Sequence, residues 1–272
     1  MENKVRSWIL FIAVASIIFS CSKKPYYYYK LAIEHENNAR YNQAVLNYTK
    51  AINLSPYAKH LYLRRGNAYK QAGDMVRAIE DFTKVIVLDK NDTLAYFLRA
   101  QTKAEREDYK EALKDFDRAI LLDDSNAVFF DARGSCYLKL KNTEKALSDY
   151  NAAIAIDSLS ASYFYNRAIC FDEMQEYIES EKNYSFAIAI DSTISEYYFN
   201  RAFARYNLGN YNSSIKDYTQ SLTFNPNDVD VYFNRAYAYY KSGMKNEACE
   251  DWSKACTLGD KEACKNSNTL CK

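Results

Sequence analysis

Residues 195–204 read SEYYFNRAFA and residues 229–238 read VDVYFNRAYA, so the central Arg-Ala pair recurs after 34 residues. The same spacing extends towards the N-terminus without a slip, through Arg65, Arg99, Arg133, Arg167, Arg201 and Arg235. A small residue follows each of these arginines, and the register extends back to Ala32. A fixed period of this length is the signature of stacked helical hairpins.

Two further columns keep the same period in the second half of each unit. One holds a small residue: Ala44, Ala78, Ala112, Ala146, Ser180, Ser214 and Ala248. The other holds an aromatic residue: Tyr48, Phe82, Phe116, Tyr150, Tyr184, Tyr218 and Trp252. Small residues on two helices allow close approach, and the large rings fill the space beside them. The period defines seven units: 25–58, 59–92, 93–126, 127–160, 161–194, 195–228 and 229–262.

These columns resemble the tetratricopeptide repeat family over residues 25–262. The resemblance implies an all-α fold: a right-handed superhelical solenoid of about seven helical hairpins, with residues 263–272 as a C-terminal cap. It also implies a non-catalytic binding surface. Two departures stand at repeat position 11, which is usually aromatic but is Lys103 or Arg205 in two units. The closing proline of the repeat occurs only as Pro56 and Pro226.

Arg stands at repeat position 7 in six units, where this family usually has Leu, and an acidic residue usually stands at position 23 of the same unit. The first unit has Leu31 and Asn47 at these positions, so the acid is absent where the base is absent. We expect forked guanidinium–carboxylate contacts within each hairpin. The alternative is a solvated surface charge. Asn183 opposite Arg167 predicts a weaker link. The expected pairs are Arg65–Asp81, Arg99–Asp115, Arg133–Asp149, Arg201–Asp217 and Arg235–Asp251.

No catalytic constellation, phosphate-binding glycine loop or metal-ligand motif stands out among the 272 residues, and the two histidines are isolated. We therefore expect no enzymatic activity, cofactor or metal. The formal net charge is +1, and it falls to zero without residues 1–20, which carry Glu2, Lys4 and Arg6. Nucleic-acid binding usually requires a basic face, so we expect no nucleic-acid partner.

Residues 1–20 have a basic start and an apolar run from Ile9 to Phe19, which predicts a secretory signal peptide. The run is short for a membrane span. Ile18, Ser20 and Cys21 resemble the lipobox of bacterial lipoproteins, which implies that Cys21 carries the lipid and becomes the mature N-terminus. An ordinary signal peptide or an uncleaved anchor is the alternative. The resemblance implies a lipid-anchored envelope protein in the outer membrane, facing the periplasm of a Gram-negative bacterium.

The first helices of the last three units are expected to line a concave groove. A ladder of Asn residues there can bond a peptide backbone, because an amide both donates and accepts. Aromatic residues between the rungs can cover apolar side chains. The alternative is that these rings pack between neighbouring helices. The expected groove residues are Asn166, Asn200, Asn234, Tyr165, Phe199, Phe203, Tyr206, Phe233, Tyr237 and Tyr240.

Four of the seven cysteines lie within the last 24 residues. If residues 261–271 form a helix that folds back at Asp260, Cys256 faces Cys264 and Cys249 faces Cys271. We expect these two nested disulfides among three connectivities, and an exported chain permits them. A zinc site is a less favoured alternative because the usual close Cys pairs are missing. Cys136 and Cys170 occupy a small-residue column and are expected in the core.

The sequence thus predicts a membrane-tethered scaffold that binds a peptide segment or protein partner in its concave groove. Two alternatives remain open. One is a structural or assembly subunit of an envelope complex without a peptide ligand. The other is binding of a glycan or peptidoglycan fragment, because aromatic rings also stack on sugars.

Overall fold

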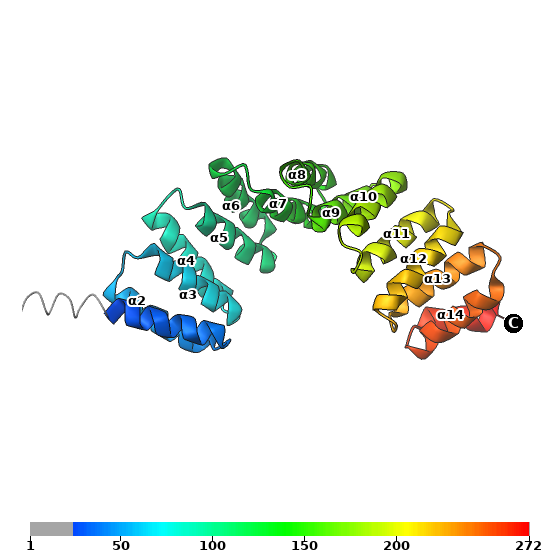
Figure 1. The fold of residues 1–272 in the computed structure, drawn as a ribbon, viewed down its shortest axis with the longest axis horizontal. Helices are drawn as coiled ribbons and strands as arrows, with labels where there is room; N and C mark the ends of the chain where they lie inside the picture. The colour runs from blue at the N-terminus through cyan, green and yellow to red at the C-terminus, as the bar shows by residue number, and fades with distance from the viewer. Residues whose placement is uncertain (1–23, 272) are drawn as a thin grey trace, which may run out of the picture. The chain divides into compact units, whose positions relative to one another are not determined.

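The structure is a computed structural model that describes residues 24–271. These residues are helical with short connections, and no strand occurs among them. They fall into two compact units, divided between Ser125 and Asn126. In Figure 1 consecutive helices within each unit lie side by side as a row of hairpins. The predicted all-α fold of repeated hairpins is confirmed.

The first unit contains three hairpins in its described part. Its first helical segment covers residues 24–37. The helices that follow are α2 (Tyr41–Leu54), α3 (Lys59–Gln71), α4 (Met75–Leu88), α5 (Thr93–Glu105) and α6 (Tyr109–Leu122).

The second unit contains four hairpins and a terminal helix. The hairpins consist of α7 (Ala127–Lys139), α8 (Thr143–Ile156), α9 (Ala161–Glu173), α10 (Tyr177–Ile190), α11 (Ser195–Asn207), α12 (Tyr211–Phe224), α13 (Val229–Lys241) and α14 (Lys245–Thr257). The terminal helix is α15 (Lys261–Leu270). It packs on α14 and has Ala263 as its single buried residue.

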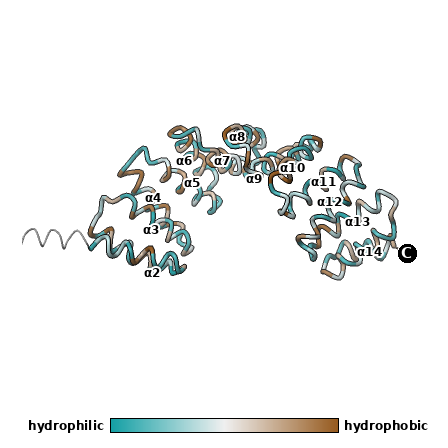
Figure 2. Tube along the Cα trace, viewed as in Figure 1, coloured by the Kyte–Doolittle hydropathy of each residue, from teal (hydrophilic) through white to brown (hydrophobic). Residues whose placement is uncertain are grey.

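The core consists of the periodic columns. The aromatic column from Tyr48 to Trp252 is fully buried in all seven repeats, and so is the small-residue column from Ala44 to Ala248. Gly66 shows how closely the first helix of the second repeat approaches the ring, because an added Cβ would lie 2.6 Å from Phe82 Cε1. Figure 2 shows hydrophobic and hydrophilic residues mixed along each helix, as expected where one face is buried.

The turn inside each hairpin has the same backbone conformation. The residue at repeat position 15 has a positive φ in all seven repeats: Ala39, Gly73, Glu107, Lys141, Gln175, Gly209 and Gly243. This left-handed conformation suits glycine and is strained for the other residues. Several helices begin with a capping side chain; Asp74, for example, accepts a hydrogen bond from the backbone N–H of Arg77.

Candidate peptide-binding groove

A small cavity lies on the surface formed by the first helices of the last two hairpins. Its volume is about 180 Å³, and it is lined by Phe203 and Tyr206 on α11 and by Phe233, Asn234 and Tyr237 on α13. All five belong to the groove residues predicted from sequence. They lie together because positions 5, 6, 9 and 12 of the repeat share one helix face, and α11 contacts α13.

The walls of the cavity are aromatic and uncharged. Phe203 leaves 39% of its surface exposed. Phe233 and Tyr237 meet edge to face, with ring centroids 5.1 Å apart. Burial raises the pKa of the Tyr206 hydroxyl. The five lining residues offer apolar area, two hydroxyl groups and one amide, and none of the five is charged.

Tyr237 is held in place from behind. Its ring packs on Trp252, with centroids 5.4 Å apart. Its hydroxyl accepts a hydrogen bond of 3.0 Å from Nδ2 of Asn266, which lies on α15. The terminal helix therefore buttresses one wall of the cavity. The repeat pattern gave no signal for Asn266, because it lies beyond the last periodic unit.

Asn234 is the one amide of the predicted ladder that lines the cavity. Its Nδ2 donates to the backbone carbonyl of Asp230 at 2.7 Å, one helical turn earlier. This bond orients the side chain. The carbonyl oxygen of the amide remains available as an acceptor for a ligand N–H.

The other predicted amides are used inside the protein. Asn166 donates to Asp131 Oδ1 at 2.8 Å. Asn200 donates to the hydroxyl of Tyr165 at 3.0 Å. The aromatic residues beside them also pack internally: Tyr165 lies 4.9 Å from Tyr197 between ring centroids. The regular three-rung ladder expected from sequence is therefore reduced to one amide at the cavity.

Phe199 and Tyr240 are the remaining predicted groove residues. Phe199 packs on the buried ring of Tyr218, with centroids 5.7 Å apart. Tyr240 is 40% exposed and lies beside Trp252, outside the cavity lining. For the residues of α9 and for Phe199, packing between helices describes their surroundings better than an open groove.

Asp131 is a partly buried carboxyl on α7, at the same repeat position as Tyr165. Burial raises its pKa, and the hydrogen bond from Asn166 partly offsets that effect. Asp172 on α9 behaves similarly, because burial raises its pKa and the hydrogen bond from the Tyr184 hydroxyl opposes the shift. Both carboxyls accept hydrogen bonds from neighbouring side chains and read as structural groups.

The structure contains the five expected Arg–Asp contacts. In each, guanidinium nitrogens lie between 2.6 and 2.9 Å from the carboxylate oxygens. These arginine and aspartate side chains are largely buried, which disfavours the alternative of solvated charges. Arg167 makes a single bond of 2.7 Å to Asn183, through Nε.

The arginines also connect successive hairpins. Their Nη1 atoms donate to a side-chain oxygen on the second helix of the preceding repeat. The acceptors are Thr49, Thr83, Asn151, Ser185 and Thr219 for Arg65, Arg99, Arg167, Arg201 and Arg235. The two basic residues at repeat position 11 also contact these aspartates. Lys103 bonds Asp115, and Arg205 bonds both Asp217 and Glu181.

The four C-terminal cysteines form the nested pairs expected from their spacing. Cys249 is bonded to Cys271 and Cys256 to Cys264, with Cα–Cα distances of 5.6 and 4.6 Å. Cys136 and Cys170 are buried thiols, and burial raises their pKa to about 11 and about 12. Residues 24–271 hold no cluster of His, Cys, Asp and Glu suited to a metal ion.

The predicted signal peptide and Cys21 lie outside the described residues. Among the helices within residues 24–271, none is both long and apolar enough to cross a membrane.

Family models of the tetratricopeptide repeat match the chain in several places. One matches residues 29–93 and 97–161, a second matches 204–243 and a third matches 229–260. Together they span most of the chain, which belongs to the tetratricopeptide repeat family. None of the curated proteins compared matches it.

Solved structures of repeat proteins share the fold. The C-terminal part of a repeat-containing protein from Cytophaga hutchinsonii is 15% identical, with a TM-score of 0.72, over 87% of this chain and 98% of that one. A tetratricopeptide repeat protein from Parabacteroides merdae is 19% identical, with a TM-score of 0.68, over 91% and 98%. YrrB, a repeat protein with an unusual peptide-binding site, is 19% identical, with a TM-score of 0.63, over 70% and 98%. At these identities the likeness is one of fold.

Proposed function

We propose that this protein is a non-catalytic, membrane-tethered scaffold that binds a peptide segment or a protein partner through its second unit. The observation that carries the proposal is the aromatic cavity on α11 and α13, walled by Phe203, Tyr206, Phe233, Asn234 and Tyr237. The family supports it, because repeats of this kind form binding surfaces, and YrrB is a peptide-binding example.

The size of the cavity favours an anchoring side chain over a cofactor. Its volume of about 180 Å³ lies below the roughly 300–1,000 Å³ of typical small-molecule sites. An aromatic or aliphatic side chain of a partner can enter it and lose its contact with water, as anchor residues do at interfaces. Asn234 can then accept one backbone N–H of the same segment and set its direction.

The tether is the second part of the proposal. Cys21 follows an apolar run and a basic start, and its lipidation would hold the chain at the membrane of a bacterial envelope. The outer membrane, on its periplasmic side, is the location we propose. Labelling with a palmitate analogue tests this assignment: the full chain should incorporate label and Cys21→Ser should not. Equal labelling of both chains would contradict lipidation at Cys21.

The binding site is tested by an envelope pull-down followed by titration of the captured partner. Phe203→Ala combined with Asn234→Ala should weaken binding at least about tenfold, which corresponds to 1.4 kcal/mol. Ile178→Ala is the matched control, because Ile178 is an exposed residue on α10, a second helix of the same unit. A partner kept by both variants would contradict the site. Partner-free multimers that survive the double substitution would favour an assembly subunit instead.

A further inference from the structure

The N-terminal end of the first hairpin differs from the corresponding ends of the later hairpins. Three tyrosines are strongly exposed there: Tyr26 and Tyr27 on the first helix, at 67% and 59%, and Tyr57 in the turn after α2, at 83%. Leu54, at the end of α2, is 44% exposed. We call these four residues, with Pro25, the aromatic end.

The two segments that form the aromatic end carry charges of one sign. Residues 22–33 and 48–59 contain lysines and no acidic residue. Lys24, Lys30 and Lys50 are exposed. Lys50 lies over the ring of Tyr28, with Nζ 5.4 Å from the centroid. In contrast, the residue corresponding to Ser55 in the next four repeats is an aspartate: Asp89, Asp123, Asp157 and Asp191.

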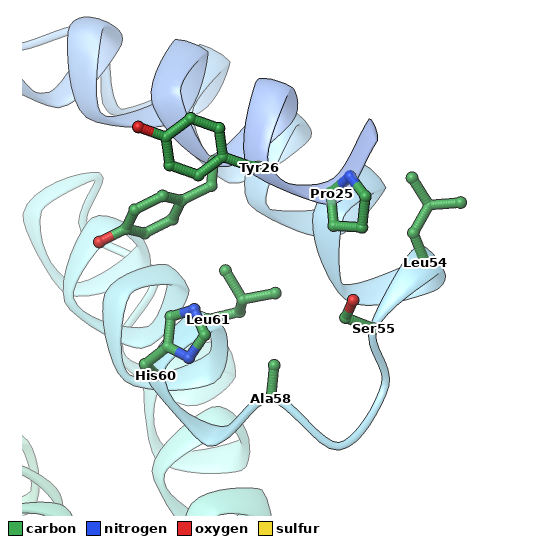
Figure 3. A pocket seen from close by; sticks show the side chains of 8 residues that line it. Pro25, Tyr26, Leu54, Ser55, Ala58, His60 and Leu61 are labelled. Atoms are coloured by element: carbon green, nitrogen blue, oxygen red, sulfur yellow. The ribbon is translucent and has the colours of Figure 1, made fainter. Parts of the chain in front are cut away.

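A recess opens at the same end. Its volume is about 570 Å³, and its lining includes Pro25, Tyr26, Leu54, Ser55, His60 and Leu61. Figure 3 shows Pro25 facing Leu54 and Ser55 across it, with His60 and Leu61 on the other side. One repeat later, Lys59 occupies the position of Pro25 and bonds Asp89 and Asp92 at 2.6 and 2.8 Å. Pro25, Ser55 and Ala58 cannot form that bridge, so the first hairpin keeps apolar surface open at its end.

We propose that the aromatic end docks onto the surface of an anionic lipid bilayer. Tyrosine is enriched at membrane–water interfaces, because its amphipathic ring sits at the level of the lipid headgroups. The lysines complement anionic headgroups, and the carboxylates of Asp89 and Asp92 in the next hairpin are paired with Lys59. The apolar run of residues 9–19 and Cys21 lie immediately before Lys24 in sequence, which brings the bilayer to this end.

This inference rests on the proposed membrane tether and adds a defined contact face to it. The tether alone leaves the first hairpin free to point in any direction. Docking of Tyr26, Tyr27 and Tyr57 fixes which end of the first unit meets the lipid. The face is an interaction surface for lipid headgroups, distinct from the aromatic cavity on α11 and α13.

Depth-dependent quenching tests the contact directly. The lipidated chain that begins at Cys21 contains one tryptophan, the fully buried Trp252, which gives a constant background. In that background, Tyr57→Trp reports on the aromatic end. Leu159→Trp is the matched control, because Leu159 occupies the same repeat position in the second unit and is 81% exposed. Both chains are bound to vesicles of phosphatidylcholine and phosphatidylglycerol whose acyl chains carry bromine.

The expected result is that the introduced tryptophan at position 57 is quenched at least about twice as strongly as the one at position 159. Adding Lys24→Glu and Lys30→Glu should reduce that quenching while the chain still floats with the vesicles. Equal, weak quenching at both positions in a chain that floats would overturn the docking and leave the tether intact. A chain that fails to float would overturn both.

Discussion

Arg201 and Asp217 are joined by two hydrogen bonds across the sixth hairpin, from Nε to Oδ2 at 2.8 Å and from Nη2 to Oδ1 at 2.7 Å. The third nitrogen of the same guanidinium donates to Ser185 of the preceding hairpin at 3.2 Å. One side chain thus connects three helices, and its counterparts do so in other repeats. Because each hairpin contacts only its neighbours, such bridges stabilise the stacking itself.

Removal of Asp217 should therefore destabilise the second unit. Asp217→Ala leaves Arg201 and Arg205 without their shared acceptor, and the side chains of Arg201 and Asp217 are only 15% and 7% exposed. We expect a loss of roughly 3 kcal/mol in the free energy of unfolding, measured with urea. Glu111→Ala breaks an exposed pair with Lys114 and should have no measurable effect. Equal effects of the two substitutions would contradict the structural role.

The fifth hairpin allows the opposite substitution, in which a carboxylate is added to the pair instead of removed. Asn183 accepts one bond from Arg167, while its own Nδ2 donates to the carbonyl of Glu179. Asn183→Asp supplies a second acceptor oxygen for the guanidinium, whose pKa is lowered by burial in the native chain. The variant should gain about 1 kcal/mol in stability. A gain that survives unchanged in a variant also carrying Arg167→Met would show that the pair is not its cause.

The turn inside the fifth hairpin should also accept a stabilising substitution. Gln175 has φ = 62°, in the left-handed region, whereas Gly209 fills the same position one repeat later with φ = 77°. Gln175→Gly should raise the free energy of unfolding by about 1 kcal/mol. The exchange Gly209→Gln should lower it by a similar amount. The measurement is the thermal unfolding midpoint of each variant relative to the parent chain. Shifts of the two midpoints in the same direction would refute the expectation.

The disulfides should govern the order of the terminal helix. Helix α15 buries one residue, so packing alone holds it weakly. The bond Cys249–Cys271 closes 22 residues and Cys256–Cys264 closes 8. Replacing the first pair by Ser should cost roughly 3 kcal/mol and the second somewhat less. Hydrogen exchange in α15 is the readout.

Loss of the disulfides should also weaken partner binding at the candidate groove. Asn266 on α15 donates to the hydroxyl of Tyr237, so a released helix withdraws support from one wall of the cavity. Reducing agent should speed exchange in α15 and weaken partner binding together. In the chain that lacks both pairs, reducing agent should have no further effect. Unchanged protection of α15 after reduction would contradict the stapling role.

Asp131 predicts a pH dependence with a defined sign. Burial raises its pKa in the folded protein above the ordinary value of about 3.9, so the folded state holds the proton more tightly than the unfolded state. Its contribution to stability is present at low pH and is lost as pH rises through the raised pKa. Asp131→Asn keeps a polar partner for Asn166 and removes the titration. The variant should therefore become more stable relative to the parent chain as pH rises above about 4.

Asp191 is the control with the opposite sign. It is exposed, and hydrogen bonds from Thr193 lower its pKa, so its contribution is present at neutral pH and is lost on acidification. Asp191→Asn should lose stability relative to the parent as pH rises. If the two variants follow the same pH profile in chemical denaturation, the assignment of Asp131 is wrong.

The 34-residue period by itself determined the hairpins, the buried columns and the Arg–Asp contacts. Each depends on short separations along the chain: Arg201 and Asp217 are 16 residues apart, so one hairpin brings them together. The cysteine pairs followed from the same kind of reasoning, because Cys256 and Cys264 flank one turn symmetrically. Local geometry is enough for such contacts, since the helix period sets which side chains share a face.

The open surface was decided only by tertiary packing. Asn166, Asn200 and Asn234 occupy identical repeat positions, yet Asn166 bonds Asp131, Asn200 bonds Tyr165 and Asn234 lines a cavity. The difference arises from the side chains that the neighbouring hairpins present. The repeat period predicts the column to which a residue belongs. Its exposure depends on the size and polarity of residues about 35 positions away, which the repeat leaves free to vary.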